Sequence, residues 1–257
     1  MYIRGPRHVM LILLFSTQFH NILTPRTVRD RLQNLDRNWN PASVASVTMD
    51  FESAMWQACR SVLPSSRLQG CNFHWAQAIW RHVQSSGLQS DYENNAVIRS
   101  RIRLIFGLPF LPSNYIGATF QYLYNFAATG ELRTLFDYVR DTWVSGDHWE
   151  PNDWCVYGRF IRTNNDVEGW HHRLNNNAQQ VNLPFYLLVT LLLKESDLVK
   201  KKQPFVLAGR YPKHQTRKTI RMNNTVARLW SEFREGRITP LQLLSRSAYA
   251  CGASMRR

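Results

Sequence analysis

Asp50 is the first carboxylate whose surroundings suggest chemistry. It follows Val44, Val47 and Met49, a short apolar pattern typical of a buried strand, and a helical pattern begins directly after it. A carboxylate between a strand and a helix lies at the edge of an open α/β sheet where ligands and catalytic groups gather. Acidic residues near a helix start also interact favourably with the helix dipole, so Asp50 and Glu52 are equally well explained as part of a helix N-terminus.

Glu168 is the second such carboxylate, and it also has two interpretations. Asn165 and Glu168 have the spacing of a capping box, in which each side chain accepts a hydrogen bond from the other residue's backbone N–H. His171 follows three residues later, so a helix brings Glu168 and His171 to one face, where they could coordinate a metal. Glu-x-x-His is also half of a di-iron site in a helical bundle, but that site needs a second pair and the sequence has none.

Cys71 and His74 form a C-x-x-H motif, which supplies half of the four ligands of a zinc site. No second pair with close spacing exists, so Cys59 and Cys155 would have to complete the site. A buried thiol and a hydrogen-bonded imidazole at a strand–helix junction explain the motif as well. Four scattered cysteines are too few for a disulfide framework, which favours a reducing compartment.

Positive charge is concentrated near the end of the sequence. The chain has a net charge of +14, and the segment 199–257 holds fourteen Lys and Arg residues against two Glu residues. The stretch 198–222 has no acidic residue, and its basic residues are Lys200, Lys201, Lys202, Arg210, Lys213, Arg217, Lys218 and Arg221. Because such a run repels itself unless a polyanion lies against it, we expect contacts to a nucleic-acid phosphate backbone without sequence preference. A solvated loop is the alternative.

Composition excludes several classes of protein. The chain has 257 residues, of which 44% are hydrophobic and 12% aromatic, which excludes wholesale disorder. The longest apolar runs, 9–15 and 183–193, are too short to span a bilayer, so we expect no membrane segment. Arg4 and Arg7 before the first run imitate a secretory signal peptide, but no small-x-small cleavage pattern follows. A basic secreted protein remains an alternative.

Hydrophobic periodicity places these residues on elements. It predicts an alternating β-α order first and an all-helical segment next. The predicted strands are 9–15, 44–50 and the segment 68–75. In the first half of the chain, the predicted helices are 24–35, 54–62, a helix reaching position 83 and several helices within 94–144. In the second half, they are a helix starting near 165, a buried helix at 185–193, an amphipathic helix around 226–233 and a last helix capped at Thr239 and Pro240.

Three segments in this order resemble the transposase domain of Mutator-like elements. They are TMDFE at 48–52, GCNFHW at 70–75 and RTNNDVEGWH at 162–171, and the resemblance covers about 9–176. That family has a ribonuclease-H-like fold with an all-helical insertion, and it holds two divalent ions with an Asp, Asp, Glu triad. The resemblance implies that Asp50 is the second carboxylate and Glu168 the third, with Mg²⁺ or Mn²⁺ as cofactor and Glu52, Asn165 and His171 in supporting positions. Two metals so placed catalyse phosphodiester cleavage and strand transfer, as DNA transposition requires.

The sequence departs from the family at its beginning. The family's first Asp lies on the first strand of the sheet, followed by two further strands, whereas 9–15 and 24–35 resemble only the third strand and the helix after it. Only Asp30 and Asp36 precede Asp50, in or beside that predicted helix. We therefore expect a chain truncated at its N-terminus with impaired catalysis, and whether Met1 is the true start decides whether the first carboxylate is missing.

The sequence thus predicts an α/β fold: a ribonuclease-H-like core with an incomplete sheet, an all-helical insertion and a basic helical C-terminal region. The expected parts are the partial core at 1–90, the helical insertion at 91–160, the final core helices carrying Glu168 at 161–198 and the basic region at 199–257. The expected function is that of a nuclear, transposase-derived protein with DNA as partner, in which a homo-oligomer is also allowed. The alternative is a non-catalytic DNA-binding or partner-binding remnant.

Overall fold

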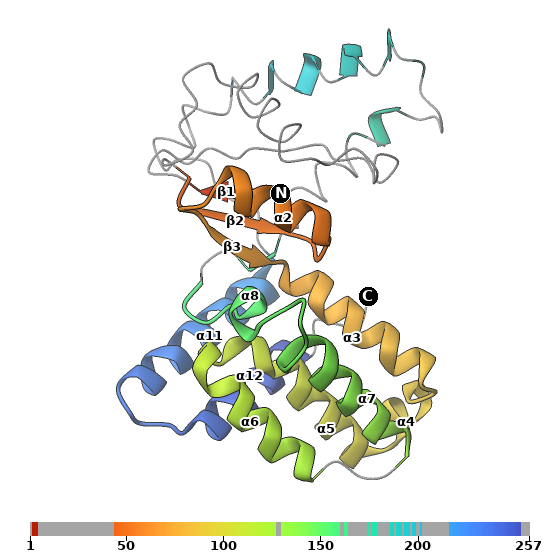
Figure 1. Ribbon diagram of the computed structural model, residues 1–257, viewed down its shortest axis with the longest axis vertical. Helices are drawn as coiled ribbons and strands as arrows, with labels where there is room; N and C mark the ends of the chain where they lie inside the picture. Colours follow the sequence, from red (N-terminus) through yellow and green to blue (C-terminus); the bar gives the residue numbers. More distant parts are fainter. Residues whose placement is uncertain are drawn as a thin grey trace.

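The computed structural model describes residues 2–4, 44–126, 130–159, 162–163 and 216–252, together with single positions and short runs between 174 and 201. Within these residues the fold has two parts, a small sheet with one covering helix and a larger helical body (Figure 1). The described residues are therefore mostly helical with one small sheet, which is compatible with the coarse α/β prediction.

The sheet has three strands in the order β1-β2-β3. β2 (Ser46–Met49) lies in the centre, antiparallel to β1 (Tyr2–Arg4) and parallel to β3 (Arg67–Gly70). Val47 and Met49 are buried and share a hydrophobic cluster with α2 (Ser53–Val62), which connects the two parallel strands. The sequence predicted β2 and β3, but residues 72–75 of the predicted strand 68–75 belong to the following helix. β1 was missed because a three-residue strand carries almost no periodic signal.

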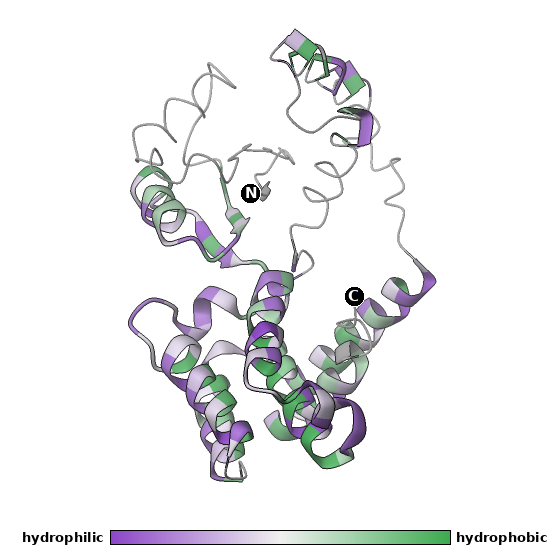
Figure 2. Cartoon of the chain, turned by 90° about the vertical axis from the view of Figure 1, so that its right-hand side faces the viewer, coloured by the Kyte–Doolittle hydropathy of each residue, from purple (hydrophilic) through white to green (hydrophobic). Residues whose placement is uncertain are grey.

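The helical body packs around one continuous hydrophobic cluster. Its elements are α3 (Asn72–Ser85), α4 (Gln89–Asn94), α5 (Ala96–Gly107), the 3₁₀ turn η3 (Leu108–Phe110), α6 (Ser113–Asn125), α7 (Glu131–Val139), the π-helical turn η4 (Arg140–Val144), α8 (Pro151–Trp154), α11 (Arg217–Arg234) and α12 (Pro240–Gly252). Figure 2 shows that the helices carry both hydrophobic and hydrophilic residues, as amphipathic helices around a core do. The all-helical prediction for 94–144 is confirmed.

The two C-terminal helices belong to the same core as the helical insertion. Val226, Leu229 and Trp230 of α11 are buried, and the Trp230 indole N–H donates to the Phe110 carbonyl at 3.0 Å. α12 packs along α5, as Figure 1 shows at the lower part of the body. The amphipathic stripe predicted in 226–233 is thus confirmed, and the four-part division of the chain stays a prediction.

The start of α12 shows why the sequence signal there was reliable. The Thr239 hydroxyl accepts a hydrogen bond from the Gln242 backbone N–H at 3.3 Å, and the Gln242 side chain accepts one from the Thr239 N–H at 2.9 Å. This reciprocal arrangement is a capping box, with Pro240 as the first helical residue. The predicted cap at Thr239 and Pro240 is confirmed.

Aromatic residues join the sheet to the helical body. The Phe51 ring, just after β2, meets Trp143 at 4.7 Å and Trp149 at 5.2 Å between centroids, both edge to face. Trp149 also contacts Trp56 of α2 at 5.0 Å. These four residues, called here the aromatic junction, fix the position of the sheet on the body because such ring pairs favour defined geometries.

The segment 185–193 differs from the prediction of a buried helix. Tyr186, Leu187, Val189 and Leu193 are all exposed, Tyr186 at 83%. An apolar run is not buried unless another element covers it, so that prediction is wrong for these four side chains. The predicted elements at 9–15, 24–35 and near 165 lie outside the described residues.

In the described part of the chain, we find no helix with enough apolar length to cross a bilayer.

Candidate functional site

Asp50 lies directly after β2, where the central strand of the sheet ends. The indole N–H of Trp56 donates to the Asp50 backbone carbonyl at 2.8 Å, which ties the loop to the first turn of α2. The Cys71 backbone N–H donates to the Met49 carbonyl at 2.8 Å, which extends the β2–β3 pairing by one bond. The ends of both parallel strands are therefore held together, and the Asp50 side chain is placed beside the N-terminus of α3.

Gly70 permits the close approach of Phe51, the residue that follows Asp50 in the sequence. A Cβ atom at position 70 would lie 2.2 Å from Cζ of the Phe51 ring, far inside contact distance. The ring fills this space and reaches the aromatic junction from there. Glycine at the end of β3 is therefore required by packing, and it sets the course of the chain through Asp50.

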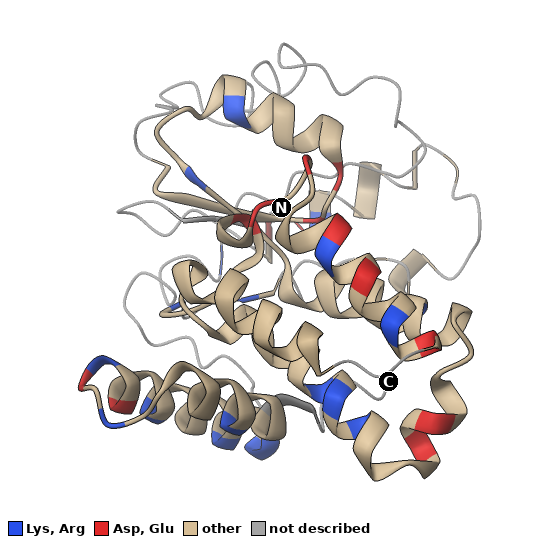
Figure 3. Cartoon of the chain, turned by 60° about the horizontal axis from the view of Figure 1, so that its bottom comes forward, with Lys and Arg blue, Asp and Glu red and all other residues tan. Residues whose placement is uncertain are grey.

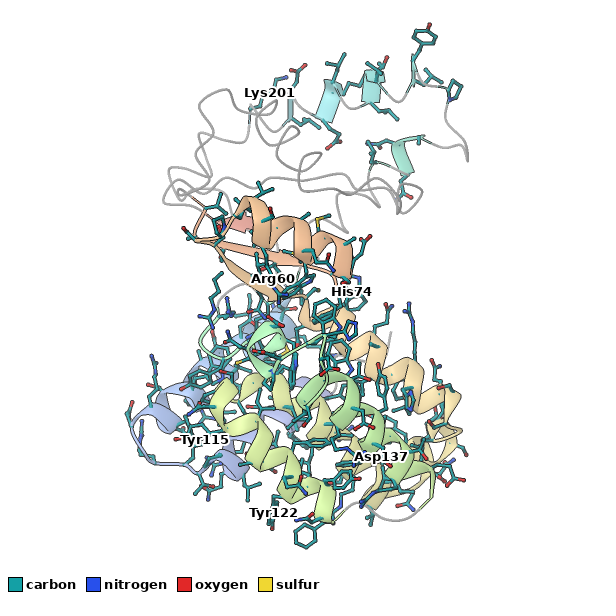
Figure 4. All side chains as sticks on the ribbon, in the orientation of Figure 1. Arg60, His74, Tyr115, Tyr122, Asp137 and Lys201 are labelled. Atoms are coloured by element: carbon teal, nitrogen blue, oxygen red, sulfur yellow. The ribbon has the colours of Figure 1, made fainter. Side chains whose placement is uncertain are left out.

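Asp50 is paired with His74, from the first turn of α3. The Asp50 Oδ1 atom lies 2.9 Å from the His74 Nδ1 atom, with 55% and 26% of the two side chains exposed. Burial lowers the pKa of His74, but hydrogen bonds to Asp50 and Cys71 and the charge on Asp50 outweigh it and raise the pKa to about 10. At neutral pH the imidazole is therefore a cation bound to Asp50. In Figure 4, His74 lies where the sheet meets the helical body.

The structure thus brings together three of the predicted site residues: Asp50, Cys71 and His74. Cys71 is fully buried and is the N-cap of α3, where its side chain makes no capping bond. The sequence suggested the Cys71–His74 pair as half of a zinc site, and it gave no sign that His74 would bind Asp50. Spacing alone could not reveal this contact, because it depends on the parallel pairing of β2 with β3.

A backbone link connects the start of α3 to α11. The Asn72 N–H donates to the Arg162 carbonyl at 2.9 Å, and the Arg162 guanidinium donates to Asn223 of α11. The Arg162 side chain also lies over the Phe110 ring, 5.6 Å from its centroid. Arg162, the first residue of the RTNNDVEGWH segment, therefore links α3 to α11.

The predicted metal ligands are only partly within the described residues. Asp50 is described, whereas Glu168 and its supporting residues Asn165 and His171 lie outside the described positions. Glu52 is the N-cap of α2 and makes no capping bond with its side chain. Across the described residues, no three His, Cys, Asp or Glu side chains come together in an arrangement that could hold a metal ion.

The basic residues of α11 form the second part of the candidate site. Arg217, Lys218 and Arg221 are exposed on the first turns of α11, and the first turn itself contains no acidic residue. Figure 3 marks Lys and Arg in blue, and α11 carries several of them along its length. Lys201 lies on the other side of the sheet from α11 in Figure 4, so the structure does not bring it to this group. The remaining predicted contacts, Lys200, Lys202, Arg210 and Lys213, lie outside the described residues.

The C-terminal end of α11 carries acidic residues that pair with arginines. Glu232 lies 3.5 Å from Arg228 and 3.2 Å from Arg246 of α12. Glu235 pairs with Arg237 in the connection to α12. Acidic partners therefore compensate the basic residues at the C-terminal end, and the positive charge of α11 is concentrated at its N-terminal end.

Comparisons of this chain with protein-family models, with curated proteins and with solved structures find no match.

Proposed function

We propose that this chain is a DNA-binding protein derived from a Mutator-like transposase. The observation that carries the proposal is the exposed group Arg217, Lys218 and Arg221 at the N-terminus of α11, called here the α11 basic group. Helix N-termini attract anions because their first N–H groups are unpaired and the helix dipole is positive there. Arg217 and Arg221 are four residues apart, and like charges at that spacing repel without an anion between them. A phosphate backbone supplies that anion.

The arrangement around Asp50 supports the family assignment within this proposal. A carboxylate follows the central strand, a second parallel strand ends beside it, and a helical body follows in the sequence. This is the order expected of a ribonuclease-H-like core with a helical insertion. The proposal also implies a nuclear protein.

A salt-dependence measurement tests the proposal. Each phosphate contact contributes close to one unit to the slope of log binding constant against log salt. We expect the triple variant R217A/K218A/R221A to bind any duplex more weakly and to lose about three units of slope. The matched control is R228A/R237A/R246A, which removes the same charge from residues that have Glu partners.

The two variants separate a specific contact from the effect of net charge. The control should retain nearly the whole slope of the wild type, since its arginines are compensated by Glu232 and Glu235. Equal losses of slope in both variants would contradict a DNA contact at the α11 basic group, and an unchanged slope in the first variant would do so directly.

Metal-dependent phosphodiester cleavage is the second candidate function, favoured by the position of Asp50 at the end of a central strand. In the structure the Asp50 carboxylate is paired with His74. Nicking of supercoiled plasmid in Mg²⁺ or Mn²⁺ decides between the two. We expect the wild type, Asp50→Asn and Glu168→Gln to be equally inactive. Nicking that both substitutions abolish, while Asp147→Asn in an exposed loop leaves it intact, would establish cleavage instead.

A further inference from the structure

Arg159 follows α8 and has an unusual environment for a guanidinium group. The chain turns at Gly158 with a φ of 70°, and the Arg159 backbone N–H donates to Val156 at 3.0 Å. The Nε and Nη2 atoms of the Arg159 side chain are buried, and neither has a hydrogen-bond partner. A buried charged donor without a partner is costly, because it loses hydration without regaining a bond.

A second guanidinium lies close to the first. Arg67, an exposed residue at the start of β3, is near enough for its charge to act on both Arg159 and Cys155. Burial and the charge of Arg67 lower the pKa of Arg159 to about 10, so the group is still charged at neutral pH. α8 and β3 are in contact, and Figure 1 shows the two elements close together.

The described residues offer no counter-charge to this pair. Asp153, the acidic residue of α8, is paired with Arg60 at 3.6 Å. Cys155 lies within electrostatic reach of both guanidinium groups, but its thiol donates to the Leu111 carbonyl at 3.0 Å and burial raises its pKa. A neutral thiol contributes no negative charge. Among the described residues, no acidic side chain therefore pairs with Arg67 or Arg159.

We propose that Arg67 and Arg159 form a binding site for an oxyanion of the phosphate type. Guanidinium groups suit this ligand, because their planar N–H donors match two phosphate oxygens at once. Arg162, three residues after Arg159, bonds Asn223 of α11, so the chain after Arg159 runs to the helix that carries the α11 basic group. The occupant is either a backbone phosphate of a nucleic acid or a free oxyanion. The site itself does not rest on the proposed function, because both sources have the same chemistry.

Thermal unfolding of the full chain in inorganic phosphate tests the site. A ligand that binds only the folded state raises Tm as its concentration increases. We expect phosphate to raise the Tm of the wild type above the value in chloride at equal ionic strength. Arg159→Gln and Arg67→Gln should each remove this phosphate-specific rise. Arg237→Gln, which removes an exposed arginine paired with Glu235, should leave it intact.

The Tm in phosphate-free buffer distinguishes a ligand site from a structural role. Arg159→Gln removes an uncompensated charge, so its Tm without phosphate should equal or exceed that of the wild type. A lower Tm would mean that Arg159 stabilises the fold by itself, and would contradict the proposal. Because Arg67 is exposed, Arg67→Gln keeps the test valid even where Arg159→Gln fails to fold. A rise that is the same in phosphate and chloride, or that survives in Arg67→Gln, would also overturn it.

Duplex DNA identifies the source of the oxyanion. If the occupant is a backbone phosphate, Arg159→Gln lowers the salt slope of duplex binding by about one unit, and duplex competes with phosphate for the Tm rise. If the occupant is a free oxyanion, the slope is unchanged and the Tm rise in phosphate persists beside bound duplex. Both results support the site. An unchanged salt slope in R217A/K218A/R221A, together with an intact phosphate-specific rise in Tm, would contradict the proposed function alone and leave the oxyanion site standing.

Discussion

Asp50 is held from several directions, and each contact comes from a different part of the sequence. Trp56 binds its backbone carbonyl, His74 binds its carboxylate, and Phe51 packs beside it over Gly70. These contacts fix the position of the half-exposed Asp50 carboxylate and of its charge. Asp50 is an acid neutralised by a cation, so this end of the sheet is less negative than the sequence alone suggests.

Gly70→Ala should destabilise the protein, because the new Cβ cannot fit unless the Phe51 ring moves away from the aromatic junction. We expect a loss of about 1–3 kcal/mol, the usual cost of overpacking. Denaturant unfolding measures it. The control is Gly117→Ala in α6, where a Cβ meets nothing within 4 Å and should stabilise the helix by about 0.5–1 kcal/mol. Equal effects of the two changes would contradict the packing argument.

His74 and His82 should titrate in opposite directions from the usual pKa of 6.5. The pKa of His74 is raised to about 10, whereas burial lowers that of His82, whose ring stacks on Tyr138 at 4.0 Å. NMR titration of the imidazole rings, assigned with His74→Gln and His82→Gln, should place one transition above and one below 6.5. Two transitions near 6.5 would contradict both environments.

The same shifts predict how stability depends on pH. Since the folded pKa of His74 is raised, its contribution is fully present below pH 6.5 and is lost as pH rises through about 10. The destabilisation caused by His74→Gln should therefore shrink over that range. His82 has a lowered pKa, so the unfolded state binds more protons below pH 6.5 and its contribution falls in acid.

Helix α5 depends on a single capping residue. The Asn95 side chain accepts hydrogen bonds from the Val97 and Ile98 backbone N–H groups at 2.9 and 3.2 Å. Asn95→Ala should cost about 1 kcal/mol, the typical loss for an N-cap. Asn94→Ala is the matched control, because the Asn94 side chain bonds only the exposed Ser90 hydroxyl at 3.3 Å. Denaturant unfolding compares the two, and a smaller loss at position 95 than at 94 would contradict this role.

Sequence patterns predicted the elements better than their contacts. β2, α2 and the cap of α12 follow local signals, namely a short apolar run, helical spacing and Thr239-Pro240. The His74 ion pair, the antiparallel β1 and the packing of α12 on α5 join residues far apart in the chain. Local periodicity carries no information about such pairings. The same limit explains the error at 185–193, where an apolar run does not reveal what covers it.

The helical body is a single packing unit that depends on α12. Leu244 of α12 is fully buried, and a Cβ at Gly107 of α5 would lie 2.9 Å from it, so the two helices are in close contact. Leu244→Ala should cost about 2–5 kcal/mol because it leaves a cavity. Leu241→Ala, on the same helix but 40% exposed, should change stability by less than about 0.5 kcal/mol.

Unfolding followed by two optical signals checks this view of the whole molecule. Far-UV circular dichroism reports the helices, and near-UV circular dichroism reports the packed tryptophans, among them Trp75 and Trp154, whose rings stack at 5.2 Å. In Leu244→Ala both signals should shift to lower denaturant together, as expected of one cooperative unit. A shift in the far-UV signal alone would mean that α12 unfolds independently.

The contact between α5 and α12 also determines when this protein can fold during synthesis. α5 leaves the ribosome long before its packing partner exists, since α6, α7, α8 and α11 are all translated in between. Contacts between distant segments slow folding, and apolar surface exposed in the meantime favours aggregation. The nascent chain therefore exposes the face of α5 that packs on α12 until α12 has been synthesised.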